Sequence, residues 1–261
     1  MVQTASGLLY RDYLKALSRA ARRWEPALGL SIIGHGRSVP RDAPLVRLHT
    51  LPQRKGGLMI MSGFHGEEPA GPLCLMHYLH HVVGRALDLK VPLIIYPVVN
   101  PYGFDHVRRS TVDGNFTNAG FVHEEDPTGP EVALIREDMS RFSPAIFLDL
   151  HEDDHEERSY VYAFGDQTVA DALVQSAARF LPVAEGPLLH TAAQVARGGQ
   201  IRDHHDGSAE DYMSHRGTLA SFATETPTRA DMAVRMAVNL GFVDTCLDAA
   251  AARRKARRQP S

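Results

Sequence analysis

Short apolar runs alternate with helical patterns along most of this chain. Residues 58–61 and 91–99 are continuously apolar, which is typical of strands buried on both faces of a sheet. Residues 8–24 instead place apolar side chains at steps of three and four, which predicts an amphipathic helix. Further strands are expected at 28–33, 45–51, 145–150, 160–164 and 219–227, and further helices at 73–83, 131–141, 169–180 and 230–251. This alternation predicts an α/β fold, with one mixed, mostly parallel sheet in a three-layer α/β/α arrangement.

The predicted strands and helices are joined by turn-rich segments and by two long irregular segments. The strands at 28–33 and 45–51 are joined by a turn-rich segment, so they are expected to form an antiparallel edge of the sheet. Residues 103–130 form a long polar connection. Residues 182–217 are rich in Gly, His and Asp and are expected to be loops that lie over a site. Connections this long inside a compact domain are usually functional.

Composition limits the classes of protein that remain. The chain has 261 residues, 44% of them hydrophobic, which suffices for one domain, expected over residues 1–252. A net charge of −3 argues against nucleic acid as a partner. The last residues, 253–261, carry five positive charges and are interpreted as a solvated basic tail without regular structure.

Other features predict a cytoplasmic protein without a membrane partner. No apolar run reaches the length of a transmembrane helix, and the first residues lack the pattern of a signal peptide. The only two cysteines, Cys74 and Cys246, lie among apolar residues in predicted helices. They are interpreted as reduced residues of the core, which fits a cytoplasmic location.

Candidate metal ligands follow two of the predicted strands. His65 and Glu68 come directly after the strand at 58–61, where open α/β sheets place their sites. An imidazole and a carboxylate at this spacing can hold one Zn²⁺ but need a third protein ligand. His151, at the tip of the strand at 145–150, is the candidate, and Asp149 on the same face could orient an imidazole. The alternative is that His151 only begins a solvated acidic loop.

A further carboxylate ends the predicted strand at 219–227. Glu225 lies in an otherwise apolar run, and a buried carboxylate is costly unless it is paired or functional. One interpretation is a general base beside a metal-activated water. The other is a capping or salt-bridged residue before the closing helix.

These pieces together resemble the zinc carboxypeptidase family (the M14-type metallopeptidases), including its succinylglutamate desuccinylase and aspartoacylase relatives. His65-Gly66-Glu67-Glu68 resembles the zinc motif of that family, and His151 resembles its third ligand. The segment 97–103 is similar to the family's strand and Asn-Pro-x-Gly turn, and 207–225 is similar to its closing segment, which ends in the catalytic glutamate. The resemblance covers most of the chain, from about residue 57 to 227.

The resemblance implies the three-layer α/β/α fold of the zinc carboxypeptidases and the hydrolysis of an amide. It implies that His65, Glu68 and His151 hold one Zn²⁺ with water in the fourth position. It implies that Glu225 takes a proton from this water as it attacks a carbonyl and passes the proton to the leaving amine. A nearby arginine would stabilise the oxyanion, and Arg108 and Arg109 are both candidates, with Arg109 preferred.

Two departures from the family concern how the substrate is read. The family pairs an asparagine with an arginine to bind the terminal carboxylate, but here Asn115 is followed by Phe116, which cannot replace a guanidinium. Either Arg108 or Arg202 takes this role, or the enzyme does not read a free α-carboxylate. The family's tyrosine before the Gly-Ser-x-Asp segment also has no counterpart in 200–205. Glu210 falls where relatives line their specificity pocket and would favour a basic substrate.

Three functions therefore remain. The first is a zinc-dependent hydrolase of carboxypeptidase type that acts on a small peptide, with Arg108, Asn115 and Glu210 as substrate-binding candidates. The second is an N-acyl amino acid deacylase, and the third is a zinc-binding module without catalysis. Outside this site, three loop histidines (His155, His204 and His205) could bind a second metal, although exposed histidines in acidic loops are more often solvated.

Overall fold

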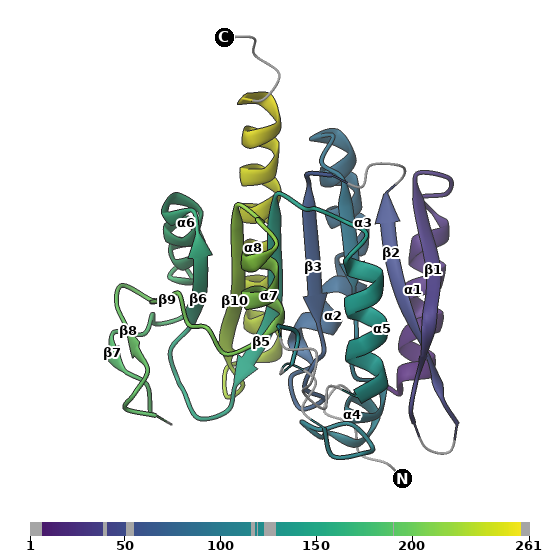
Figure 1. Cartoon of the computed structure of the whole chain (residues 1–261), viewed down its shortest axis with the longest axis horizontal. Helices are drawn as coiled ribbons and strands as arrows, with labels where there is room; N and C mark the ends of the chain where they lie inside the picture. The colour runs from purple at the N-terminus through teal and green to yellow at the C-terminus, as the bar shows by residue number, and fades with distance from the viewer. Residues whose placement is uncertain are drawn as a thin grey trace.

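The computed structural model describes residues 7–38, 41–50, 55–115, 118, 120–122, 129–189 and 191–256. Within these residues, the central feature is an eight-stranded sheet with the order β1-β2-β4-β3-β5-β10-β6-β9 (Figure 1). Its strands are β1 (Leu28–Gly36), β2 (Ala43–Thr50), β3 (Leu58–Ser62), β4 (Leu93–Tyr96), β5 (Ile146–Asp153), β6 (Tyr160–Gly165), β9 (Gln200–Arg202) and β10 (Ala220–Pro227). A small hairpin, β7 (Gly186–Pro187) with β8 (Val195–Ala196), stands apart.

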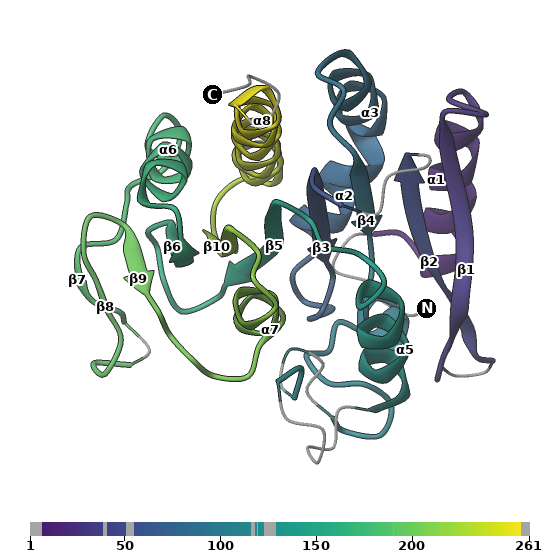
Figure 2. The same ribbon diagram turned by 45° about the horizontal axis from the view of Figure 1, so that its top comes forward.

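Helices cover both faces of the sheet (Figure 2). One face carries α1 (Tyr10–Arg22), α2 (Ala70–His77), α3 (Leu79–Asp88), α6 (Gln167–Ala177) and α8 (Met232–Ala256). The other carries α5 (Gly129–Met139) and α7 (Ala209–His215), and α4 (Pro101–His106) is a short helix after β4. No helix in the described ranges is both long enough and apolar enough to cross a lipid bilayer.

The centre of the sheet is parallel and buried on both sides. β4, β3, β5 and β10 are neighbours with parallel pairing, and every residue of β3, β4 and β5 is buried. β1, β2 and β6 pair in antiparallel fashion, with β1 and β2 at the expected edge. The predicted α/β fold with a mixed, mostly parallel sheet between helical layers is confirmed, because continuously apolar runs leave no solvated face.

Two separate hydrophobic clusters hold the layers together. One joins the sheet to α1, α2, α3, α6 and α8 and includes Tyr13, Leu148 and Phe242. The other joins the opposite face to α5 and α7 through Met59 and Met213. Cys74 on α2 and Cys246 on α8 are buried free thiols, as expected.

The structure corrects three local expectations. Residues 182–217 are not all loop, since they contain β9, which joins the main sheet, and α7. The turn at 101–106 is one short helix, α4. The closing helix continues through Ala256 into the stretch interpreted as a tail, and Arg253 forms an ion pair with Asp166 at the start of α6. Residues 257–261 lie outside the described ranges.

Candidate active site

The loop after β3 is shaped by close backbone contact with α4. A Cβ atom on Gly66 would lie 1.8 Å from the carbonyl oxygen of Gly103, so only glycine fits there. The backbone N–H of Gly66 also donates to the carbonyl oxygen of Arg108 at 2.9 Å. These contacts fix the turn that carries His65 and Glu68 out of the sheet.

Asn100 connects this turn to the segment that carries Arg109. Its side-chain oxygen accepts a hydrogen bond from the backbone N–H of Gly103 at 2.8 Å and caps α4. Its amide nitrogen donates to the carbonyl oxygens of Phe64 at 3.3 Å and Arg109 at 3.4 Å. The asparagine is 1% exposed, so the Asn-Pro turn seen in the sequence serves to place two parts of the site together.

The structure brings His65, Glu68 and His151 together. Nδ1 of His65 is 2.7 Å from Oε1 of Glu68, and Nδ1 of His151 is 2.9 Å from Oε2 of the same carboxylate. All three side chains are at most 4% exposed. One ligand atom from each lies within 4.8 Å of the others. Residues 83 positions apart in the chain therefore converge on one point.

The imidazole of His151 is oriented from its other side. Oδ2 of Asp149 lies 3.0 Å from Nε2 of His151, and the amide nitrogen of Asn118 lies 3.2 Å from the same atom. Asn118 also accepts a hydrogen bond from the backbone N–H of Ala209 at the start of α7. A carboxylate behind an imidazole fixes the ring and makes it a stronger ligand.

The pKa values of Glu68 and His151 are strongly shifted, both by burial and by the charges of neighbouring side chains. Burial alone would raise the pKa of Glu68, but the imidazoles of His65 and His151 outweigh it and hold that pKa well below its usual range. Burial would lower the pKa of His151, yet the carboxylates of Asp149 and Glu68 raise it well above its ordinary value. The cluster thus stabilises a positive charge at its centre.

These residues fit a divalent metal ion. Two imidazole nitrogens and one carboxylate oxygen form a donor set that Zn²⁺ commonly takes in catalytic sites. Both Nδ1 atoms already point at Glu68, and Asp149 holds His151 as metal ligands are usually held. The backbone N–H of Glu152 also donates to Glu68 at 3.2 Å, which orients the carboxylate.

Glu225 lies next to this cluster because of strand register. β10 places it directly opposite His151 on β5 and opposite Tyr160 on β6. Burial raises the pKa of Glu225 well above its usual value, and the nearby carboxylates of Glu68 and Asp153 add to this effect. Its Oε2 atom is buried and has no hydrogen-bond partner among the described residues. A carboxyl group with a free buried oxygen is suited to receive a proton or a polar substrate atom.

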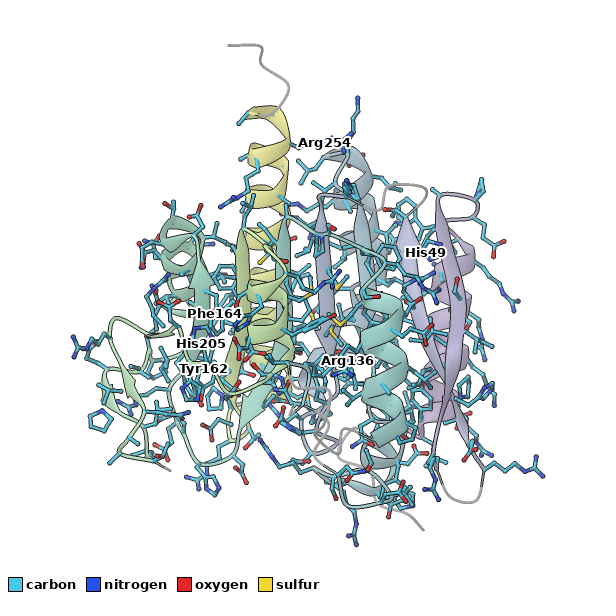
Figure 3. All side chains as sticks on the ribbon, viewed as in Figure 1. His49, Arg136, Tyr162, Phe164, His205 and Arg254 are labelled. Atoms are coloured by element: carbon cyan, nitrogen blue, oxygen red, sulfur yellow. The ribbon has the colours of Figure 1, made fainter. Side chains whose placement is uncertain are left out.

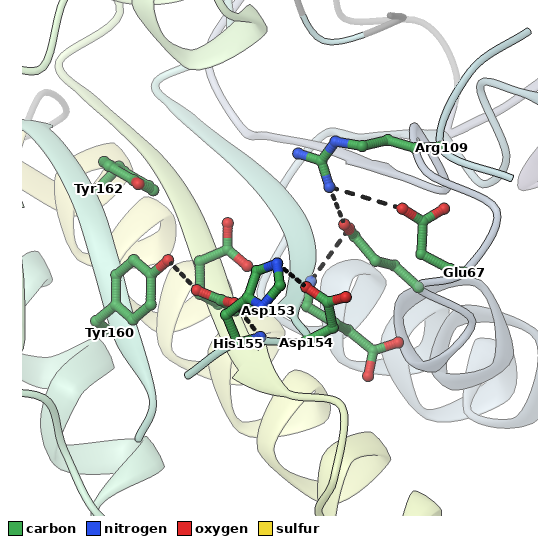
Figure 4. Close-up of a pocket in the computed structure, with 10 residues that line it drawn as sticks. Glu67, Arg109, Asp153, Asp154, His155, Tyr160 and Tyr162 are labelled. Carbon is green, nitrogen blue, oxygen red and sulfur yellow. Dashed lines mark hydrogen bonds and ion pairs between the residues drawn. The ribbon is translucent and has the colours of Figure 1, made fainter. Parts of the chain in front are cut away.

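Glu68 of this cluster and Glu225 both line one cleft of about 290 Å³ (Figure 4). Arg109 and Glu67 lie on one side of the view, and Tyr160 and Tyr162 lie on the other. Nη1 of Arg109 is 3.3 Å from Oε1 of Glu68. The described residues that line the cleft are Glu67, Glu68, Arg109, Glu152, Asp153, Asp154, His155, Tyr160, Tyr162 and Glu225. The lining is strongly acidic, with a single guanidinium.

Several candidate substrate residues do not reach the described cleft lining. Arg108 is exposed, although it is adjacent to Arg109. Asn115 lies in a turn, where its carbonyl oxygen accepts from the N–H of Thr111. Arg202 donates to the carbonyl oxygen of Gly165 at 2.8 Å on β6. The replacement at Phe116 falls outside the described residues.

Glu210 is buried instead of lining the cleft. It is 3% exposed and lies on α7, near Asp149. Burial and the charges of Asp149 and Asp206 raise its pKa to about 8. At neutral pH this carboxyl is largely protonated, so its position does not match that of a charged specificity residue.

The three loop histidines also do not form one group. His155 is paired with Asp154, and His204 packs on Tyr162 and contacts the Gln194 side chain at 3.0 Å. Within the described chain, only His205 belongs to a group with metal-ligand spacing, and its partners are different residues.

Sequence reasoning missed three residues of the site. Asn118 comes from the polar connection 103–130, whose sequence carries no pattern that predicts its path. Tyr160 and Tyr162 alternate on β6, and the hydroxyl of Tyr160 donates to Asp153 at 2.8 Å. The period of two along this strand was a usable signal, because it places both phenols on one face.

Comparisons with known proteins identify one family model and several similar structures. A family model described as a protein of unknown function (DUF2817) matches residues 43–176. No curated protein matches the chain. A candidate metallopeptidase from Shewanella amazonensis is 26% identical, with a TM-score of 0.79 over 92% of each chain. Another from Shewanella denitrificans is 25% identical, with a TM-score of 0.81 over 92% of this chain and 90% of that one.

More distant structures share the fold. A metallo-carboxypeptidase from Pseudomonas aeruginosa, solved in complex with (2-guanidinoethylmercapto)succinic acid, is 18% identical. Its TM-score is 0.66, over 92% of this chain and 68% of that one. The carboxypeptidase-type fold implied by the sequence resemblance is therefore confirmed. The structures at 25–26% identity are candidate metallopeptidases, which supports a hydrolase and a metal cofactor at the level of the fold family.

Proposed function

The chain belongs to the DUF2817 family, whose function is unknown, and we propose that it is a zinc-dependent amide hydrolase of carboxypeptidase type. One observation carries the proposal. His65, Glu68 and His151 converge in a buried group, and Glu225 lines the same cleft as Glu68. Ligands and a general base are the parts that metal-assisted hydrolysis requires.

The metal would be held by His65, Glu68 and His151. When bound, a zinc ion supplies a Lewis acid that polarises the scissile carbonyl and lowers the pKa of water to near neutrality. Asp149 holds the ring of His151 through Nε2 and so keeps its Nδ1 turned toward Glu68.

Glu225 acts as the general base and then as the general acid. It takes a proton from the attacking water and passes it to the nitrogen of the leaving amine. Burial and the nearby carboxylates of Glu68 and Asp153 raise its pKa, which makes the carboxylate a stronger base for the first step. The unpartnered Oε2 is the atom assigned to this transfer.

Arg109 stabilises the charge that develops on the carbonyl oxygen. Its guanidinium reaches the edge of the ligand group, at 3.3 Å from Glu68, while its side chain is 54% exposed. A fixed positive group aimed at a developing oxyanion commonly contributes more than other single effects. Arg108 is not assigned this role, because it is absent from the described lining of the cleft.

The acidic lining favours a peptide with neutral or basic groups near the scissile amide. Asp154, Glu67 and the other carboxyl groups face a single guanidinium among the described lining residues. The free C-terminus of a peptide and an N-acyl amino acid both carry a carboxylate, so the substrate panel, and not the acidic lining, separates the peptidase from the deacylase.

The test is hydrolysis of a mixed panel by the zinc-loaded protein. The panel contains peptides with basic, neutral and acidic C-terminal residues, peptides with a blocked C-terminus, and N-acyl amino acids. The Glu225→Gln variant should lose about 100- to 10,000-fold in kcat while it retains zinc. Glu157→Gln is the matched control, since this carboxylate is exposed and pairs only with Arg229 among the contacts described.

The outcomes separate the three functions. Cleavage of a peptide bond that Glu225→Gln abolishes supports the proposal. Release of an acyl group from N-acyl amino acids alone assigns the deacylase reaction. Zinc binding without turnover of any substrate, together with unchanged ligand binding in Glu225→Gln, indicates the non-catalytic module.

A further inference from the structure

A second group of ligand-type side chains lies on α7, outside the cleft. Asp211 and His215 are one helical turn apart and therefore share a face. Oδ1 of Asp211 is 2.6 Å from Nδ1 of His205 and 3.2 Å from Nδ1 of His215. One ligand atom from each residue lies within 4.8 Å of the others.

The group is shaped in advance by its surroundings. Oδ2 of Asp211 accepts a hydrogen bond from the backbone N–H of Gly207 at 3.0 Å, which leaves Oδ1 to face the two histidines. The ring of His205 packs against Phe164 with 5.2 Å between centroids (Figure 3). The rings of His205 and His215 meet edge to face at 5.3 Å. The carbonyl oxygen of Asp211 also lies 2.9 Å from Nδ1 of His215, which holds this ring against the helix.

The three side chains differ in their exposed fractions, in a way that suits an ion arriving from solvent. The side chain of Asp211 is only 2% exposed, whereas those of His205 and His215 are 56% and 54% exposed. The carboxylate is thus fixed in the protein, and the two imidazoles can turn toward a cation without disturbing the core. None of the three residues lines the cleft.

We propose that His205, Asp211 and His215 form a second metal site that takes Zn²⁺ or a similar divalent transition metal. Two imidazoles and a carboxylate suit Zn²⁺, Co²⁺, Ni²⁺ and Cu²⁺, while Ca²⁺ and Mg²⁺ prefer all-oxygen ligands. The fourth position faces solvent. The site is separate from the His65–Glu68–His151 group, with which it shares no residue.

The site is structural, because of what its ligands connect. His205 comes from the loop between β9 and α7, and the other two ligands come from α7 itself. The carbonyl oxygen of Glu210, next to Asp211, accepts a hydrogen bond from Ser221 on β10 at 2.7 Å. An ion here joins the loop to the helix and so supports the segment that packs beside β10, the strand that carries Glu225.

The same contacts can exist without a metal, since two imidazoles can share one carboxylate by hydrogen bonds alone. A count of bound metal separates these two cases. The tag-free chain is stripped with a chelator and titrated with Co²⁺ and Zn²⁺ by calorimetry, and bound metal is measured by elemental analysis. The variants are His215→Gln and His205→Ala/His215→Ala, and His204→Ala is the matched control because it removes an adjacent loop histidine outside the group.

The expected result is one metal equivalent fewer in His205→Ala/His215→Ala than in the unmodified chain, with no loss in His204→Ala. This difference does not depend on the proposed function, because His65→Ala should lose a different equivalent. Equal stoichiometry in the unmodified chain and the double variant overturns the proposal. If the double variant does not fold, as judged by circular dichroism, His215→Gln decides, because this side chain is half exposed.

Discussion

At the scale of single residues, the site depends on carboxylates that hold imidazoles. Asp149 is fully buried, and one of its oxygens contacts Nε2 of His151. Its other oxygen has no hydrogen-bond partner among the described residues. A buried charge of this kind is costly unless it acts on a neighbour. The geometry therefore assigns Asp149 to the positioning of His151.

Replacing Asp149 by Asn should weaken metal binding by about 10- to 100-fold. The amide keeps the size of the side chain but removes the charge that strengthens His151 as a ligand. Affinity is measured by competition with a zinc chelator. Asp154→Asn is the control, because Asp154 is exposed at the mouth of the same cleft. Unchanged affinity in Asp149→Asn would show that the ring of His151 is held by other contacts.

At the scale of elements, one ion pair fastens the connection between β5 and β6. Glu156 is buried and receives two hydrogen bonds from the guanidinium of Arg158, at 2.7 and 2.9 Å. Arg158 also donates to the carbonyl oxygens of Glu185 and Pro187. The pair therefore joins this connection to the small hairpin. Hydrogen bonds from Arg158 lower the pKa of Glu156 to about 2.

This shift predicts how stability depends on pH. The carboxylate form is favoured in the folded state, so its contribution is complete above a pH of about 4.5 and is lost as the pH falls toward 2. Glu156→Gln should lower the free energy of unfolding at pH 7 by about 2 kcal/mol. It should also flatten the pH dependence between pH 5 and pH 2.

Urea unfolding at several pH values between 3 and 7 measures both effects. Glu157→Gln serves as the comparison, since its pair with Arg229 is exposed on both sides. Such pairs contribute little. If Glu156→Gln and Glu157→Gln behave alike, the buried pair does not stabilise the connection.

The sequence predicted long apolar elements and missed short ones. β3 and β5 were expected because they are buried on both faces, which demands unbroken apolar runs. α7 has seven residues, and its buried apolar residues are Ala209 and Met213, too few positions to show a helical period. Its signal was Ser208, which caps the helix. β9 has three residues and shows no period at all.

The same contrast holds within the site. His65, Glu68, His151 and Glu225 were predicted because each ends or follows an apolar strand, and strand ends meet at one edge of the sheet. Their assignment as ligands and base stays a prediction. Asn118 could not be predicted, since its place depends on the path of a long polar connection.

At the scale of the whole molecule, the site joins segments that the core holds separately. Glu68 follows β3, and its carboxylate contacts His151 on β5 and the backbone of Glu152. An ion in this group binds only the folded chain, because the unfolded chain does not bring the ligands together. Metal binding and global stability are therefore linked.

Removal of the metal should lower the melting temperature. A ligand at 100 times its Kd stabilises the folded state by about 2.7 kcal/mol. The comparison is made in His205→Ala/His215→Ala, so that the group on α7 does not contribute. Calorimetry with chelator and after return of Zn²⁺ should show a reversible shift, which His65→Ala should lack. A melting temperature that does not respond to chelator in the double variant argues against an ion in the His65–Glu68–His151 group.

The order of the strands in the sheet differs from the order in which they are synthesised. β10 is the last strand to be made, yet it lies between β5 and β6, which are made earlier. Until residue 227 has left the ribosome, these two strands face a gap one strand wide, and their open edges can accept a strand from another chain. Glu225 arrives on the strand that closes this gap. The proposed general base is therefore the last part of the site to join the sheet, after the strands that precede and carry the proposed metal ligands.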